Sequence, residues 1–215
     1  MLYGVLIVVA CAASAPFPET FEHWAQGRVG PVVFPEGSSH TWDEFTGFAR
    51  ELCAQAVKTW IGARKPGEAF AAIQTEPYRN LIRTFRTVHF NISPSYVADG
   101  YAKGKIVPEM LEAVRREWHD IALFLCRARA FPDQTFLLSV GGEINVYLGT
   151  KSAYPDFPVS EYVDACHAGK EAALAELPAE QRARVFSVAE LQGDIEFDAF
   201  AERWVPTFGT DLVSL

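Results

Sequence analysis

The chain has 215 residues, of which 49% are hydrophobic and 21% are charged. Such a composition is typical of a folded globular protein and argues against an intrinsically disordered chain. The formal net charge is −8, and Lys and Arg form no stripe interleaved with aromatic residues. We therefore expect no nucleic-acid partner, because binding nucleic acid requires a basic surface that neutralises phosphates.

An apolar run begins the chain and extends from residue 2 to residue 13. It is shorter than the roughly 20 residues that a membrane-spanning helix needs, so we expect no transmembrane span in the mature chain. Residues 1–15 match a signal peptide, because Ala13–Ala15 resembles a cleavage site and Val8–Cys11 resembles a lipobox with a lipid anchor at Cys11. This interpretation makes the protein extracytoplasmic: periplasmic, secreted or lipid-anchored. No positive charge precedes the run, and a buried strand is the alternative interpretation.

Beyond Pro18, strand-like and helix-like segments alternate. Strands are expected where β-branched and aromatic residues cluster, at 28–34, 56–62, 87–92, from 135 onward, at 184–190 and at 211–215. Helices are expected where apolar residues recur every three or four positions, at 42–55, within 69–81, at 107–130, at 160–176 and at 197–204. This order indicates βα units around a parallel sheet.

The sequence stops within the last of these strands. We expect a fragment, because natural domains rarely end in the middle of an apolar strand. Six such strands in about 200 residues extrapolate to eight in about 250, the usual size of a (β/α)₈ barrel. The expected fold class is therefore α/β, an incomplete TIM barrel with about six of eight strands, in one domain over residues 16–215.

In such a barrel the active site lies at the C-terminal ends of the strands. Side chains alternate along a strand, so His89 and Asn91 share one face and are expected to point into the barrel. Lys58 and Trp60 share a face of their strand in the same way. These four residues are candidates for binding a substrate.

Two carboxylates, Glu143 and Glu190, each follow an apolar strand at its C-terminal end. A carboxylate pair suits glycoside hydrolysis, in which one group protonates the leaving oxygen and the other attacks the anomeric carbon or activates water. The acid partner needs a raised pKa, which burial supplies. Gly141 and Gly142 interrupt the strand before Glu143 and leave room for a ligand near the backbone.

Aromatic and amide side chains near these ends complete the expected site. Asn145 is a candidate to hydrogen-bond a sugar hydroxyl, and sugar stacking is assigned to Trp60, Tyr147 and Tyr154.

Each assignment has a structural alternative. Glu143 would otherwise cap the following segment, and Glu190 would be a solvated strand end. His89 would be a buried core histidine with its hydrogen bonds satisfied, and Lys58 would pair with a core carboxylate.

Other chemistries have less support. The sequence contains no GxSxG elbow, P-loop, GxGxxG after a strand or HExxH motif. Its four cysteines form no CxxC pair, and its five histidines have no metal-ligand spacing. We expect neither a metal nor a cofactor, and Cys53 and Cys126 are expected to act as small hydrophobic residues.

Four stretches carry a resemblance to a known family: Val57–Gly62, Thr135–Leu138 with Gly142–Asn145, Val188–Glu190 and Asp211–Ser214. Over residues 28–215 the chain resembles the clan of (β/α)₈ glycoside hydrolases whose acid/base glutamate ends the fourth strand and whose nucleophile glutamate ends the seventh. It looks closest to uncharacterised bacterial glycosidase-like barrels.

The resemblance implies roles for particular residues. Glu143 matches the acid/base, and it also ends the fourth strand expected from the sequence pattern. Lys58 stands where the clan often has an arginine, and Gly142 stands where the clan has an asparagine. The nucleophile position falls beyond Leu215, so the fragment is expected to be inactive alone.

The sequence thus predicts a glycosidase that hydrolyses O-glycosidic bonds of a neutral carbohydrate, with Glu143 as general acid/base. Two alternatives stay open. One is a Schiff-base aldolase or lyase that uses Lys58, since burial lowers the pKa of a lysine. The other is a non-catalytic carbohydrate-binding barrel, with which Gly142 is compatible.

Overall fold

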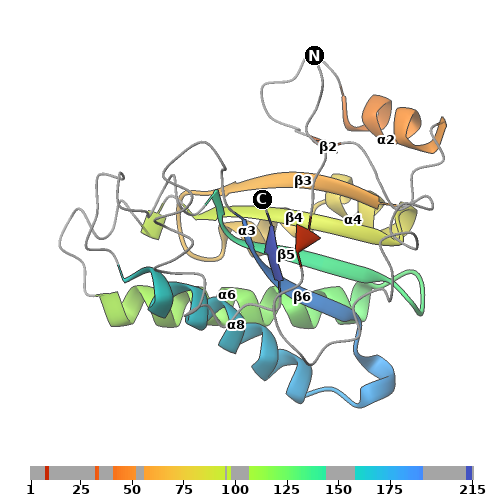
Figure 1. Cartoon of the computed structure of the whole chain (residues 1–215). Coiled ribbons are helices and arrows are strands. Elements are labelled where there is room, and N and C mark those ends of the chain that lie inside the picture. Colours follow the sequence, from red (N-terminus) through yellow and green to blue (C-terminus); the bar gives the residue numbers. More distant parts are fainter. Residues whose placement is uncertain are drawn as a thin grey trace.

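A computed structural model describes residues 8–9, 32–33, 41–51, 56–94, 96–97, 107–143, 158–190 and 212–214. These residues form an α/β structure in which one sheet lies against a layer of helices (Figure 1). The expected α/β class is confirmed. The described strands form an open sheet with β1 and β2 at its edges, so closure into a barrel is not shown.

The sheet follows the order of the chain. Its strands are β1 (Val8–Val9), β2 (Val32–Val33), β3 (Ala56–Ala63), β4 (Thr87–Pro94), β5 (Thr135–Glu143), β6 (Arg184–Glu190) and β7 (Leu212–Ser214). From β2 to β7 each strand pairs in parallel with the next, and β1 pairs antiparallel with β7. A doubly wound sheet would reverse its strand order at a switch point, whereas the order from β2 to β7 proceeds in one direction.

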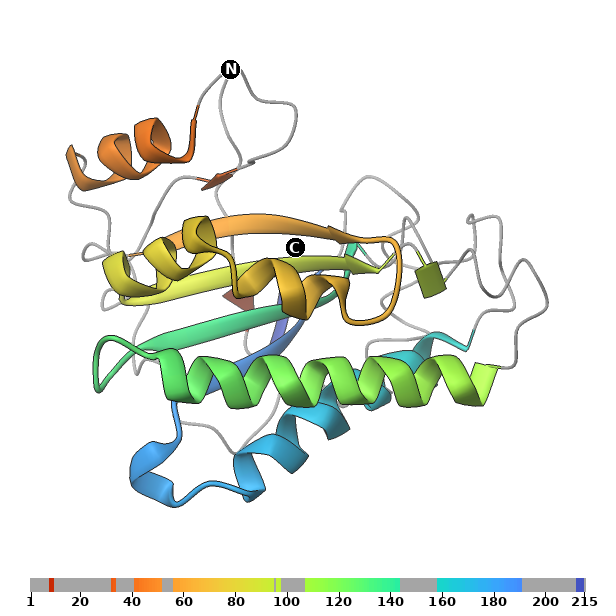
Figure 2. The ribbon, with the colours of Figure 1, turned by 180° about the vertical axis from the view of Figure 1, so that it is seen from behind.

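Four helices cover one face of this sheet. The described part of the chain contains the helices α2 (Trp42–Glu51), α3 (Glu68–Ile73), α4 (Glu76–Thr84), α6 (Val107–Ala128), α8 (Val159–Ala175) and the 3₁₀ helix η1 (Ala179–Gln181). Seen from behind, α3, α4, α6 and α8 lie in front of the strands (Figure 2). In the described part of the chain, no helix combines the length and the apolar character needed to cross a membrane.

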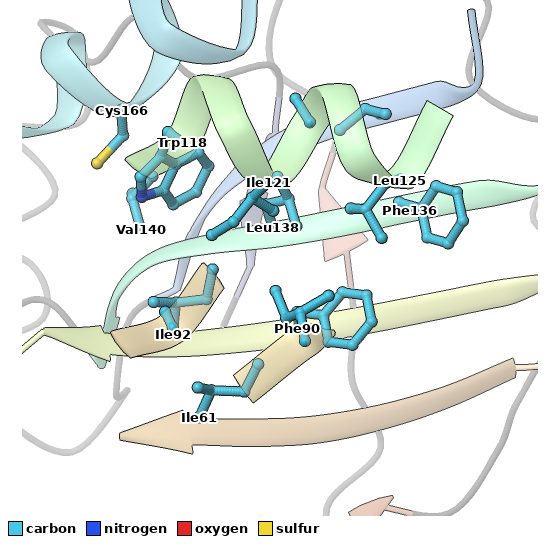
Figure 3. Close-up of a cluster of buried hydrophobic side chains, with 14 of the residues drawn as sticks. Ile61, Phe90, Ile92, Trp118, Ile121, Leu125, Phe136, Leu138, Val140 and Cys166 are labelled. Atoms are coloured by element: carbon cyan, nitrogen blue, oxygen red, sulfur yellow. The ribbon is translucent and has the colours of Figure 1, made fainter. Parts of the chain in front are cut away.

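The core lies between the sheet and these helices. Alternate residues of β3, β4, β5 and β6 are buried on this side, including Ile61, Phe90, Ile92, Phe136, Leu138 and Val140. From α6, Trp118, Ile121 and Leu125 pack against them at helical spacing (Figure 3). Fully burying a side chain of this size stabilises the fold by about 1.5–3 kcal/mol. The apolar faces of these four strands are thus directed toward the helices, which assigns the intervening residues to the opposite face.

The observed bounds refine the expected ones. Strands β3, β4 and β6 and helices α6 and α8 occupy the segments expected from the sequence. Between β3 and β4 the chain forms two helices, α3 and α4, with Pro77 in the first turn of α4. In the segment 28–34 only Val32–Val33 is described as strand, and the helix expected at 197–204 lies outside the described residues.

Candidate active site

Polar residues of three strands gather on the sheet face opposite the helices. Because register partners in a parallel sheet point to the same side, this face consists of rows that cross the strands. The first row contains Lys58, His89, Leu137 and Phe186. The second row, closer to the C-terminal ends, contains Trp60, Asn91, Ser139 and Val188. The four candidate ligand-binding residues of β3 and β4 therefore lie side by side on one face.

Side chains of the second row are exposed to solvent at the β3 end and buried at the β5 end. The exposed fraction falls from 38% at Trp60 to 8% at Asn91 and to 0% at Ser139. Among the large hydrophobic residues that the structure describes, Trp60 is the exposed one. A ligand therefore has access to this face at β3, while the part at β5 is covered.

A buried hydrogen bond joins the two rows. His89 Nε2 lies 2.5 Å from the Ser139 Oγ atom, and both side chains are buried. Ser139 was not among the residues singled out from the sequence. The signal was present, because alternation beyond Phe136 and Leu138 places Ser139 on the face opposite the core.

Glu143 and Glu190 are the last residues of β5 and β6, and their backbones are register partners. The register shifts just before this pair: from Ser139 to Glu143 β5 advances by four positions, whereas from Val188 to Glu190 β6 advances by two. Such an irregularity bends a strand, and glycine is suited to it. The break expected at Gly141 and Gly142 is therefore a shift of register within a strand that continues to Glu143.

Several expected site residues lie outside the described part of the chain. This applies to Asn145, Tyr147 and Tyr154, and also to Cys11 and Cys53.

A buried carboxylate lies behind the C-terminal ends of β3 and β4. Glu117 of α6 accepts hydrogen bonds from the backbone N–H groups of Ala69 (2.9 Å) and Phe70 (3.2 Å), in the first turn of α3. Its other oxygen accepts a hydrogen bond from the Tyr96 hydroxyl at 3.1 Å. Burial and the nearby Glu117 carboxylate raise the pKa of Tyr96. Glu117 thus connects the segments that leave β3 and β4.

Glu117 was not among the residues predicted from the sequence, although its position in the apolar pattern of α6 is unusual for a carboxylate. It lies three residues after Val114 and four before Ile121, both of which are buried, so it falls within the apolar stripe of α6. A carboxylate at such a position needs hydrogen-bond donors from another part of the fold.

The described cysteines are structural. Cys126 and Cys166 are free and buried, and burial raises the pKa of both thiols. The Cys126 Sγ atom accepts a hydrogen bond from the Ala183 N–H group at 3.3 Å. Cys126 therefore acts as the small hydrophobic residue that was expected. Within the described ranges, no group of three or more His, Cys, Asp or Glu side chains could hold a metal ion.

Comparisons of the chain with protein-family models, with curated proteins and with solved structures gave no match.

Proposed function

We propose that this chain belongs to a (β/α)₈ barrel that hydrolyses O-glycosidic bonds of a neutral carbohydrate. Glu143 is the general acid/base. The observation that carries the proposal is the register pairing of Glu143 with Glu190, beside a polar sheet face. Two carboxylate-bearing residues thus end neighbouring strands at the edge where barrel enzymes have their active sites.

The strand order supports the barrel. A sheet that winds in one direction with helices on one face is the arrangement that closes into a (β/α)₈ barrel, whose other face becomes the interior. In this chain that other face contains His89 and Asn91 beside Lys58 and Trp60.

The chemistry follows from the spacing of the strands. Neighbouring strands lie about 4.8 Å apart, and the two carboxyl groups of glycosidases lie roughly 5–9.5 Å apart. Glu143 would protonate the leaving oxygen, and a second carboxylate nearby favours the protonated form of such an acid. Glu190 is our candidate for that second carboxylate. In the family that the chain resembles, the nucleophile ends the seventh barrel strand. The parallel strands β2 to β7 would be the first six, because β1 pairs antiparallel with β7.

The remaining candidates bind the sugar. Trp60 offers an exposed ring for stacking, and Asn91 offers an amide that both donates and accepts hydrogen bonds. Lys58 is half-buried on the same face. We assign Asn145 and Tyr147 to the same task because they follow Glu143 in the sequence.

The test is hydrolysis of aryl glycosides by the full-length gene product. We expect Glu143→Gln to lower kcat by about 10²–10⁴-fold, the usual contribution of a general acid. Unchanged hydrolysis in this variant would contradict the assignment.

One observation favours a second candidate, a Schiff-base aldolase or lyase. Lys58 and His89 are register partners on the same face, which places an amine beside a base. The amine would condense with a substrate carbonyl and release water. Borohydride would then trap the substrate covalently on Lys58, and the absence of trapping with a panel of aldehydes and ketones would exclude this chemistry.

We also propose export by the signal at residues 1–15. Val8–Val9 forms β1, which pairs with β7, and processing at Ala13–Ala15 or before Cys11 would remove this strand from the mature sheet. Mass spectrometry of the N-terminus of the mature protein distinguishes cleavage at Ala13–Ala15 from cleavage before Cys11. A terminus at Met1 would contradict export by cleavage.

A further inference from the structure

We propose that Ser139 is a positioning residue that sets the selectivity of a pyranose subsite formed by Trp60 and Asn91. The inference deepens the proposed function and rests on it for the choice of a carbohydrate as the ligand. Side-chain exposure along the second row decreases from Trp60 through Asn91 to Ser139.

Trp60 and Asn91 are the two residues of this row that a ligand entering at β3 meets first. They are register partners on neighbouring strands, so an indole ring and a side-chain amide lie next to each other. A pyranose presents a flat apolar face to the indole and hydroxyl groups at its edge to the amide. A purely apolar ring would make no use of the amide.

Ser139 lies on the other side of Asn91, as its register partner on β5. Its hydroxyl bonds to His89 Nε2 at 2.5 Å. His89 precedes Asn91 by two residues on the same face of β4. The bond therefore holds the imidazole toward β5 and directs Nε2 away from the ligand. Asn91 then selects among the hydroxyl groups without competition from His89.

The chain contains a matched control on the opposite face. Ser187 of β6 is fully buried like Ser139, and its Oγ lies 2.9 Å from the His167 Nδ1 atom of α8. Removing either hydroxyl breaks a buried serine–histidine hydrogen bond. Only the loss of the Ser139 hydroxyl releases a side chain beside the subsite.

The experiment measures binding in the full-length gene product carrying Glu143→Gln, which prevents turnover of the probe. The probes are the methyl pyranosides of glucose, galactose, mannose and xylose. NMR and tryptophan fluorescence measure the affinity of each. We expect Trp60→Ala to weaken binding about tenfold, the upper range for an aromatic contact. We expect Ser139→Ala to change the affinity ratio between the best probe and its epimers by about threefold or more, the effect of one hydrogen bond, whereas Ser187→Ala leaves this ratio unchanged.

Three results would overturn the inference: no pyranoside binds at millimolar concentration, Trp60→Ala binds like the parent, or Ser139→Ala and Ser187→Ala alter the ratio equally. If Ser139→Ala unfolds, Ser139→Thr keeps the hydroxyl and is expected to keep the selectivity of the parent. Hydrolysis is not the readout, so a failure of the Glu143 assignment leaves this test intact.

Discussion

The carboxylate of Glu117 and the hydroxyl of Tyr96 form a buried hydrogen bond of 3.1 Å that connects α6 to the segment after β4. The same carboxylate accepts two backbone N–H groups at the start of α3. One side chain therefore connects the segment after β3 with the segment after β4, near the candidate site.

We expect Glu117→Leu to lower the free energy of unfolding by about 2–4 kcal/mol, because it leaves buried donors without an acceptor. Glu117→Gln keeps a carbonyl oxygen for the α3 amides and is expected to cost less. Urea denaturation measures both. The control is Glu112→Gln on the same helix, where an exposed carboxylate lies 3.8 Å from Arg115 and its loss should cost under about 1 kcal/mol. Equal losses at both positions would contradict the role of Glu117.

Gly169 of α8 lies directly against the backbone of α6. A Cβ atom added at Gly169 would lie 2.2 Å from the backbone oxygen of Arg115 and 3.1 Å from the backbone nitrogen of His119. Backbone atoms cannot move aside like a flexible side chain, so we expect Gly169→Ala to destabilise the protein by about 1–3 kcal/mol. Gly47 in α2 has no atom within 4 Å of such a Cβ, and Gly47→Ala is expected to be neutral or stabilising by about 1 kcal/mol. Thermal denaturation compares the two. A Gly169→Ala variant as stable as the parent would contradict this packing.

Gln134 satisfies backbone groups at the start of β5. Its Nε2 donates to the carbonyl oxygens of Ile82 (2.6 Å) and Phe85 (2.7 Å), and its Oε1 accepts the N–H of Ala130 at 2.7 Å. We expect Gln134→Met to cost about 2–4 kcal/mol, since it removes the partners of two buried carbonyl oxygens and of one partly buried N–H group. Gln134→Glu should also destabilise at neutral pH, because it replaces the donor by a charge that faces two carbonyl oxygens. Urea denaturation at pH 7 tests both, and a loss under about 0.5 kcal/mol would contradict the prediction.

His119 makes the contact between α6 and the end of α8 dependent on pH. Hydrogen bonds to Asp120 (3.1 Å) and Glu176 (2.8 Å) raise the pKa of His119 above its usual 6.5. A group whose pKa is higher in the folded state stabilises that state fully below its unfolded pKa and loses this effect as pH rises through its folded pKa.

We therefore expect His119→Gln to be less stable than the parent at pH 5.5, by under about 1 kcal/mol because the pair is partly exposed. The difference should shrink at pH 9. Glu176→Gln is the control, and in that background the effect of His119→Gln should decrease. A difference that grows from pH 5.5 to pH 9 would contradict the prediction. Denaturant titrations at the two pH values measure it.

Local patterns were sufficient to predict most of the regular elements. Helix α6 follows from apolar residues at three- and four-residue steps, and β4 follows from the alternation that separates His89 and Asn91 from Phe90 and Ile92. The same alternation placed Lys58 and Trp60 on one face. Such patterns depend only on residues close together in the chain, so they can be recognised in a single sequence.

Local patterns could not predict the contacts between different strands and helices. The bond between His89 and Ser139 depends on the register of β4 against β5, which no local period specifies. Glu117 meets its donors in α3 only after the helices pack. The register shift before Glu143 likewise depends on both β5 and β6, so the two glycines predicted a break but not a continuous strand.

If Glu143 donates a proton to the leaving oxygen, as we propose, the effect of replacing it must depend on the leaving group. For the full-length gene product, kcat/KM should be compared between an aryl glycoside with a poor leaving group, phenol, and one with a good leaving group, 2,4-dinitrophenol. We expect Glu143→Gln to slow phenyl glycoside hydrolysis by about 10²-fold or more and dinitrophenyl glycoside hydrolysis far less, because dinitrophenolate leaves with little protonation. Equal rate losses for both substrates, or no loss for the phenyl glycoside, would contradict it.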